Sequence, residues 1–226
     1  MNTIRSERVQ MTLNRLYLDS RSDVFRMLNW IPSQISEFFQ PWREIHREGV
    51  EKRAKHLREN FLGITKEQGD LLYTLVRLKQ PDLVVEFGAS MGISTLYLGS
   101  ALEDNGHGKM ITSELEPGKC ERVRCNLQEA GLSDLVEVRE GDARETLKEL
   151  DSNIDFLFLD GWKALYLPVL AVVEDRLLPG STVLADDTRR RRKHTKPFFD
   201  HMVDPDNGYI TVELKTGHGM SLSVRK

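Results

Sequence analysis

The chain has 226 residues, of which 39% are hydrophobic and 30% are charged. Its 32 basic and 35 acidic side chains nearly cancel to a formal charge of −3, so the whole chain has no net attraction to nucleic acid or to an anionic membrane. This composition excludes collagen-like, disulfide-rich and intrinsically disordered proteins, and the length suits one domain with an appended segment.

The sequence carries no signal that predicts export or membrane insertion. It begins MNTIRSERVQ, without the apolar stretch of a secretory signal, and its longest apolar runs are far too short to span a bilayer. Cys120 and Cys125 fall close together in an expected helix, where their spacing is poor for a disulfide. We therefore expect reduced thiols in a cytoplasmic protein with no membrane partner.

Residues 1–60 are charged and dotted with aromatic side chains, with no run typical of a strand. Apolar side chains recur at helical spacing, and Pro32 and Pro41 interrupt the pattern. We predict several short helices in this segment, as a unit separate from residues 61–226. They could form a lid over a substrate or a dimer surface, and we expect a homodimer.

From Thr65 onward, the pattern alternates between helices and strands. Thr65 and Gln68 have capping-box spacing at the start of a helix that Pro81 stops. Five buried strands are predicted, at Leu83–Phe87, Met110–Ser113, Val136–Val138, Ile154–Leu159 and Ser181–Ala185. The intervening helices are predicted from Gly92 to Asn105, from Pro117 to Gly131, and from the fourth strand to Leu178.

The rhythm changes near the end of the sequence. Tyr209–Leu214 and Met220–Val224 flank the glycine-containing segment Lys215–Gly219, which predicts an antiparallel hairpin. The predicted fold is therefore α/β: a doubly wound, mostly parallel, seven-stranded sheet with a C-terminal hairpin and N-terminal helices. In such sheets, ligands bind at the carboxyl ends of the strands.

A glycine turn follows the first strand, in Val85-Glu86-Phe87-Gly88-Ala89-Ser90-Met91-Gly92. Gly88 and Gly92 do not match the G-x-G-x-x-G spacing of dinucleotide sites. The preceding Glu86 would repel a pyrophosphate but suits a cationic ligand, such as the amino group of S-adenosylmethionine. An ordinary strand–turn–helix corner is the alternative interpretation.

Acidic residues also follow the second and third strands. Glu114 stands where a carboxylate commonly accepts hydrogen bonds from ribose hydroxyls, although a solvated acid is the alternative. Asp142, after Gly141, could accept from an adenine amino group or could cap a helix that starts at Ala143. Glu116 is interpreted as a helix-capping acid before Pro117.

Three more carboxylates follow the fourth and fifth strands. Asp160 stands in Asp160-Gly161-Trp162-Lys163, and Asp186 and Asp187 come directly after the fifth strand. Grouped carboxylates repel one another unless they are protonated or neutralised by a cation. Oxygen ligands favour Mg²⁺, with Mn²⁺ or Ca²⁺ as alternatives, and capping with loop solvation is the other interpretation.

The motifs VVEFGASMGIS, TSELEP, EGDA, DFLFLDGWKALY and VLADD, in this order, resemble those of class I S-adenosylmethionine-dependent methyltransferases. The pairing of Asp160-x-x-Lys163 with Asp186-Asp187 is more specific. It resembles the divalent-cation-dependent O-methyltransferases of the catechol and caffeoyl-CoA type. The resemblance runs from about Gly63 to the end. It implies a Rossmann-like fold and methyl transfer to the hydroxyl of a phenol-like or catechol-like small molecule.

The resemblance also implies roles for individual residues. The cofactor-binding set is Glu86, Gly88 and Ser94 at the methionine end, Glu114 at the ribose, Gly141, Asp142 and Ala143 at the adenine, Trp162 near the adenine or at the edge of the active site, and Asp160, which is also counted with Lys163 as catalytic. The metal ligands are Asp160, Asp186 and Asp187, and Lys163 matches the general base. A cation beside Lys163, together with partial desolvation, would lower the pKa of its amine toward the range useful for a base. A surface lysine is the alternative.

The sequence departs from the catechol type at three places. Asp187 replaces an Asn, Gly161 replaces a His, and the basic run Arg189–His194 replaces an apolar loop. The basic run could recruit an anionic substrate or could simply be solvated. Two other functions stay open: a metal-independent class I methyltransferase, and a nucleotide-binding regulatory protein with a decayed site. No nucleic-acid partner is expected.

Overall fold

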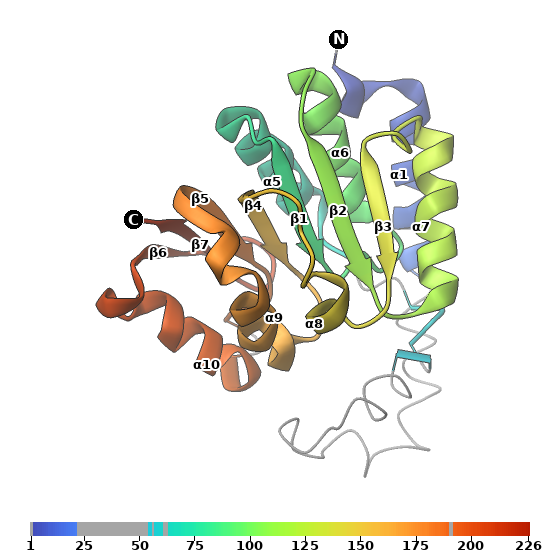
Figure 1. Ribbon diagram of the computed structural model, residues 1–226. Coiled ribbons are helices and arrows are strands. Elements are labelled where there is room, and N and C mark those ends of the chain that lie inside the picture. Colours follow the sequence, from blue (N-terminus) through green and yellow to red (C-terminus); the bar gives the residue numbers. More distant parts are fainter. Residues whose placement is uncertain (1, 22–53, 56, 61–62, 190–191) are drawn as a thin grey trace, which may run out of the picture.

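The computed structural model describes residues 2–21, 54–55, 57–60, 63–189 and 192–226. Seven strands form one sheet in the order β3-β2-β1-β4-β5-β7-β6 (Figure 1). The strands are β1 (Leu83–Phe87), β2 (Lys109–Glu114), β3 (Val136–Glu140), β4 (Ile154–Leu159), β5 (Leu177–Ala185), β6 (Tyr209–Leu214) and β7 (Met220–Arg225). The first five are parallel, and β7 pairs antiparallel with both β5 and β6. The predicted doubly wound sheet with a C-terminal hairpin is confirmed.

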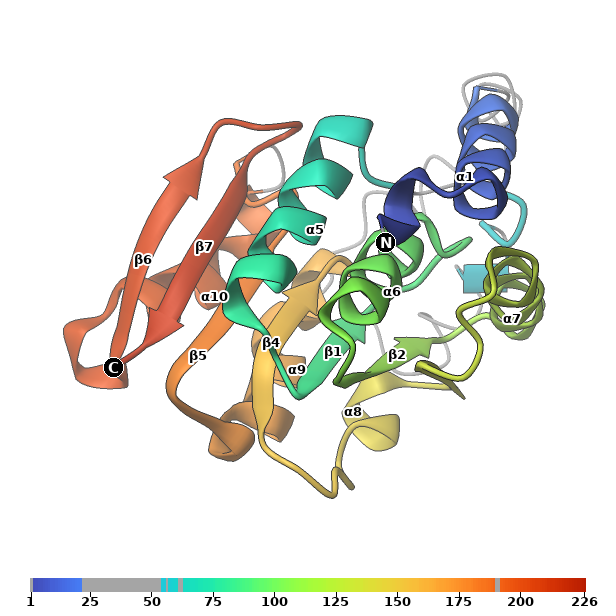
Figure 2. The same cartoon turned by 90° about the horizontal axis from the view of Figure 1, so that it is seen from above.

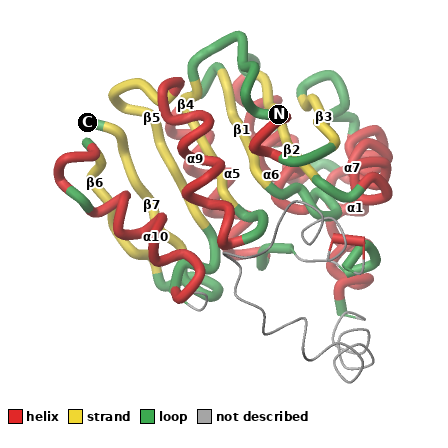
Figure 3. Tube along the Cα trace, turned by 60° about the horizontal axis from the view of Figure 1, so that its bottom comes forward, coloured by secondary structure: helices red, strands yellow, loops and turns green. Residues whose placement is uncertain are grey.

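Helices cover both faces of the sheet (Figures 2 and 3). One layer holds α1 (Glu7–Ser20), α5 (Lys66–Lys79), α6 (Ile93–Asn105) and α7 (Pro117–Ala130), and the other holds α8 (Ala143–Thr146), α9 (Tyr166–Val173) and α10 (Arg192–Val203). Neighbouring residues of the central strands alternate between the two cores, with Phe156 and Phe158 in the first and Leu157 and Leu159 in the second. A strand covered on both faces has no polar side, which explains the apolar run Phe156–Leu159 of β4.

Local signals in the sequence account for several helix ends. Thr65 caps α5, and the reciprocal hydrogen bonds between Thr65 and Gln68 confirm the capping box. The Glu116 carboxylate caps α7, whose first residue is Pro117. These caps position α5 and α7 with their amino termini at the carboxyl edge of the sheet.

The boundary between α9 and β5 was wrongly predicted. The helix ends at Val173, and β5 begins at Leu177 instead of Ser181. Pro179 and Gly180, which predicted a break, lie inside the strand, where its pairing with β4 shifts register between Ile154 and Phe156. An irregular ladder tolerates a proline, so the usual stop signal was not a stop here.

The described part of the N-terminal segment packs on the sheet domain. The helix α1 and the preceding 3₁₀ turn (Thr3–Arg5) bury Ile4, Val9, Leu13 and Leu16 in the same core as α6 and α7. The further helices predicted around Pro32 and Pro41 lie outside the described residues.

The basic run is partly helical. Arg190 and Arg191 lie outside the described residues, whereas Arg192 and Lys193 begin α10, a helix that the sequence did not predict. The helix is stabilised by Phe198 and Met202, which are buried in the second core. The helical spacing of its apolar residues was not recognised in the sequence because cations precede them and Pro197 lies among them.

Cys120 is a buried thiol and Cys125 an exposed one, and they form no disulfide. No helix in the described ranges is long and apolar enough to cross a membrane.

Candidate active site

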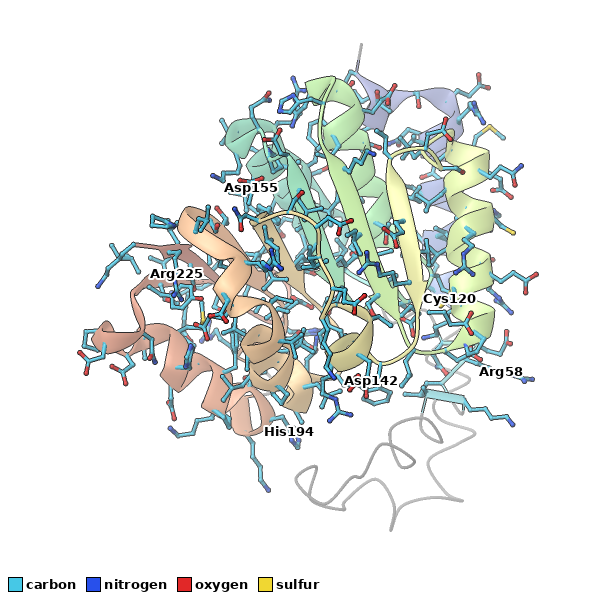
Figure 4. All side chains as sticks on the ribbon, in the orientation of Figure 1. Arg58, Cys120, Asp142, Asp155, His194 and Arg225 are labelled. Carbon is cyan, nitrogen blue, oxygen red and sulfur yellow. The ribbon has the colours of Figure 1, made fainter. Side chains whose placement is uncertain are left out.

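The candidate residues lie just beyond the carboxyl ends of β1 to β5. Backbone hydrogen bonds extend the strand pairing into this edge, from Asp160 N to Phe87 O (2.9 Å) and from Asp186 N to Leu159 O (3.0 Å). In Figure 4, the labelled Asp142 lies at this lower edge, whereas Asp155 lies at the opposite end of the strands. The fold therefore brings together acidic residues from five segments of the chain.

Gly88 has a backbone conformation that only glycine adopts readily, with φ +97°. A Cβ atom there would lie 2.5 Å from Cα and 2.6 Å from N of Gly161. The glycine is thus required because the chain segments leaving β1 and β4 touch each other. The sequence analysis attributes Gly88 to a close approach of the backbone to a ligand. The contact with Gly161 is an additional reason for a glycine at this position.

Glu86 is completely buried beside the glycine turn. Its Oε2 accepts hydrogen bonds from Thr95 (2.7 Å) and Thr112 (2.6 Å), while Oε1 has no hydrogen-bond partner among the described residues. Burial raises the pKa of the Glu86 carboxyl, and hydroxyl groups, with Ser94 foremost, oppose this shift. A buried carboxylate oxygen without a donor fits a cationic group of a ligand, such as the amino group of S-adenosylmethionine.

Glu114 holds the glycine turn through its carboxylate. Its Oε2 accepts from the backbone N–H of Ser90 (2.8 Å), and its Oε1 accepts from the N–H groups of Leu115 and Glu116. The interpretation as a solvated acid is therefore wrong. Its contact with a ribose stays a prediction.

Asp142 caps α8 by accepting from the backbone N–H of Arg144, and it also pairs with the Arg144 guanidinium at 2.6 Å. Of its two interpretations, the capping role is confirmed, and the adenine contact stays a prediction. Asp142, Gly141 and Glu116 line a hollow of about 450 Å³ that Arg58 and Lys55 border. Ala143 is buried.

We expect Glu114→Ala to weaken the binding of S-adenosylhomocysteine at least about tenfold, because hydrogen bonds to a charged group contribute about 1.5–3 kcal/mol. The loss combines the predicted ribose contact with the support of the Ser90 turn. Isothermal titration calorimetry measures it. Glu137→Ala, at an exposed acid of the neighbouring strand, is the control and should bind normally. Unchanged affinity in Glu114→Ala would remove this residue from the cofactor site.

Asp160, Asp186, Asp187 and Lys163 form a second group, which we call the acidic site. The Lys163 ammonium lies 2.8 Å from Oδ1 of Asp160 and 3.8 Å from Oδ2 of Asp187. It also donates to the Tyr166 hydroxyl (2.8 Å), which in turn donates to the backbone carbonyl of Asp186 (3.1 Å). Lys163 is therefore not a surface lysine.

The acidic site has more negative charge than its one lysine can neutralise. Burial lowers the pKa of Lys163, but Asp160 and the other surrounding groups raise it well above the usual value. The sequence-based prediction of a lowered pKa assumes a bound cation beside Lys163 and stays a prediction, because the groups that raise the pKa here are the neighbouring carboxylates and Tyr166 alone. Burial raises the pKa of Asp160 to about 8, with Lys163 opposing this shift and Asp186 adding to it.

The acidic site fits a divalent cation by its chemistry. It offers carboxylate oxygens, the ligands that Mg²⁺ and Mn²⁺ prefer, and Oδ1 of Asp187 is buried with only the His218 imidazole nearby, at 3.2 Å. Asp187 also has an unusual φ of +57°. However, no group of three His, Cys, Asp or Glu side chains in the described ranges is arranged to hold a metal ion. The Lys163 ammonium lies among the carboxylates instead.

Three residues of the acidic site escaped the sequence analysis. Tyr166 follows Lys163 at helical spacing, Gln68 contacts Asp186, and the imidazole Nδ1 of His218 lies 3.2 Å from Oδ1 of Asp187. The capping box had already singled out Gln68, but it pointed only to a local role. His218 stands between two glycines of the hairpin loop, and only the sheet order brings that loop to the end of β5.

Trp162 is partly buried against the core on the α8 and α9 side. Gly161, beside it, leaves little room for a side chain. A Cβ atom at Gly161 would lie 2.4 Å from the Phe87 ring.

The sequence matches a family model described as a methyltransferase domain over residues 85–188. The catechol O-methyltransferase of Mycobacterium tuberculosis is 30% identical over 179 residues, which cover 72% of this chain and 80% of the relative. That of Niastella koreensis is 29% identical over 136 residues, covering 58% of this chain and 61% of the relative, so the match spans less than two thirds of that enzyme.

Solved structures share the fold. The O-methyltransferase TomG of Streptomyces achromogenes, in complex with S-adenosylmethionine, has a TM-score of 0.67 at 22% identity and covers 93% of this chain and 98% of its own. A putative caffeoyl-CoA O-methyltransferase of Staphylococcus aureus has a TM-score of 0.63 at 20% identity and covers 90% and 100%. These structures show the fold, and the relative of Mycobacterium tuberculosis, at 30% identity over 80% of its length, shows that the chain belongs to the class I S-adenosylmethionine-dependent O-methyltransferases.

Proposed function

We propose that the protein transfers the methyl group of S-adenosylmethionine to a hydroxyl of a phenol-like or catechol-like small molecule, with the help of a divalent cation. The observation that carries this proposal is the acidic site, where the Lys163 ammonium pairs with Asp160 and Asp187 and the Asp186 carboxylate lies beside them, at the sheet edge that also carries the glycine turn. Asp160, Asp186 and Asp187 would hold the cation, and Mg²⁺ is its expected identity.

The chemistry is an in-line attack of the acceptor oxygen on the sulfonium methyl group. The new O–C bond forms as the S–C bond breaks, and the acceptor loses its hydroxyl proton. A bound divalent cation would lower the pKa of that hydroxyl and neutralise carboxylates. Because the cation would neutralise the carboxylates that hold the proton of Lys163, the ammonium would lose that proton to solvent. The neutral amine would then accept the hydroxyl proton of the acceptor at Nζ. Tyr166, which hydrogen-bonds to Nζ, would keep the amine aimed at the acceptor.

An anionic acceptor is the second part of the proposal. Arg189 is exposed next to the acidic site, and its side chain packs against Gly219 of the hairpin loop. Arg192 and Lys193 follow at the start of α10. Arginine guanidinium groups suit carboxylate or phosphate oxygens on a substrate, so this run would recruit a carboxylated or phosphorylated phenol.

Chelation tests the cation. We expect EDTA to abolish methyl transfer from labelled S-adenosylmethionine to a panel of catechols, other phenols and acyl thioesters, and Mg²⁺ or Mn²⁺ to restore it. The reason is that the acceptor hydroxyl would stay protonated and Lys163 would stay an ammonium. Full activity after exhaustive chelation would instead support the metal-independent alternative.

A further inference from the structure

Gln68 connects the start of α5 with the acidic site. Its side chain is only 3% exposed, so each polar atom of the amide needs a partner. The Oε1 atom accepts from the backbone N–H of Thr65 at 2.9 Å, within the capping box. Because a backbone N–H can only donate, this contact identifies the oxygen end of the amide. The Nε2 group must therefore donate elsewhere.

Nε2 of Gln68 donates to Oδ1 of Asp186 at 2.5 Å, in a buried hydrogen bond. Asp186 is 8% exposed, and its backbone is fixed by the hydrogen bond to Leu159 O. The amide therefore determines the rotation of the carboxylate and occupies one of its two oxygens. A carboxylate without such a partner would turn more freely.

The hairpin loop closes over this hydrogen bond. A Cβ atom at Gly217 would lie 2.6 Å from Nε2 of Gln68, so only glycine leaves room for the amide. The same loop is tied to the end of β5 by the hydrogen bond from Thr188 N to Gly219 O (3.0 Å). Two elements far apart in the chain, α5 and the β6–β7 loop, thus enclose one oxygen of Asp186.

We propose that Gln68 is a positioning residue that orients Asp186 as a ligand of the divalent cation, with Gly217 holding the Gln68 amide in place. The proposal rests on the cation of the proposed function. Partners that orient a metal ligand typically change metal affinity by 10–100-fold when they are removed. Gln68 also caps a helix, so the test must separate its two roles.

The test measures Mn²⁺ affinity, from the electron paramagnetic resonance signal of free Mn²⁺, on the purified full chain. Gln68→Met removes both the cap and the Asp186 contact, and Thr65→Ala removes only the capping hydroxyl. We expect Gln68→Met to weaken Mn²⁺ binding about tenfold or more, with S-adenosylhomocysteine affinity unchanged. Thr65→Ala should lower the melting temperature and leave Mn²⁺ affinity unchanged.

A second variant serves if Gln68→Met does not fold. Gly217→Ala would push the amide away from Asp186 and should weaken Mn²⁺ binding in the same way. Gly208→Ala is its matched control, because Gly208 also has a positive φ (+75°) but a Cβ there would touch nothing within 4 Å. It should bind Mn²⁺ like the wild type.

The outcomes separate the proposals. If the wild type binds Mn²⁺ and Asp160→Asn does not, while Gln68→Met and Gly217→Ala bind normally, the role of Gln68 is overturned and the cation stands. Equal weakening by Thr65→Ala and Gln68→Met would also overturn it, in favour of a purely structural cap. A wild type that binds no Mn²⁺ would overturn both.

Discussion

Replacing Lys163 with alanine is expected to lower kcat by roughly 10²–10⁴-fold, the usual contribution of a general base. The amine is the one basic group that contacts Asp160, Asp187 and Tyr166 in the described structure. Its loss would leave the acceptor hydroxyl without a group to take its proton. The measurement is single-turnover methyl transfer with saturating cofactor and Mg²⁺.

Two further variants show what Lys163 does. Lys163→Arg keeps the positive charge, but a guanidinium does not deprotonate in proteins. If Lys163 is the base, Lys163→Arg should be as slow as Lys163→Ala. If it only neutralises the carboxylates, Lys163→Arg should keep most of the activity. Lys148→Ala breaks an exposed ion pair with Glu145 that has the same i,i+3 spacing as the Asp160–Lys163 pair, and it should leave kcat unchanged.

Gly88→Ala is expected to destabilise the fold by about 3 kcal/mol. The methyl group would lie 2.5 Å from the Gly161 backbone, and backbone atoms cannot turn aside as a flexible side chain can. For a chain of this length, the melting temperature should fall by about 6–12 °C. Thermal unfolding followed by circular dichroism measures the change.

Gly106→Ala separates the two causes of that loss. Gly106 also has a positive φ (+75°), but a Cβ there has nothing within 4 Å. It should therefore show only the backbone cost of about 1 kcal/mol. Equal melting temperatures for the two variants would mean that the steric contact with Gly161 does not add to the stability loss of Gly88→Ala.

The sequence predicted the elements whose signals are local. The strand at Ile154–Leu159 is apolar from Phe156 onward because helices cover both faces, and Thr65 with Gln68 marked the start of α5. The end of α9 was missed because Pro179 and Gly180 lie within β5, where the pairing with β4 is irregular. That irregularity depends on both strands and cannot be predicted from either segment alone. The helix at Arg192–Val203 was missed because charge dominated its first turn.

The same limit applies to the candidate site. Asp160, Asp186 and Asp187 were predicted to share an edge because parallel strands end together, and the structure brings them there. The contacts of Gln68 and His218 depend on where α5 and the hairpin loop lie in space, which no spacing in the sequence reveals. The direction of the Lys163 pKa shift also required the distances to its carboxylate neighbours.

The pairing of β1 with β4 has a consequence for how the protein acquires its activity. These neighbours in the sheet are separated in the chain by two complete strand–helix units, so they meet only after a long loop closes. The glycine turn follows β1, and Asp160 of the acidic site follows β4. Neither the glycine turn nor the acidic site can form from local contacts alone. Transient separation of β1 from β4 would therefore disrupt both of them together. The glycine turn and Asp160 of the acidic site therefore depend on the same strand pairing.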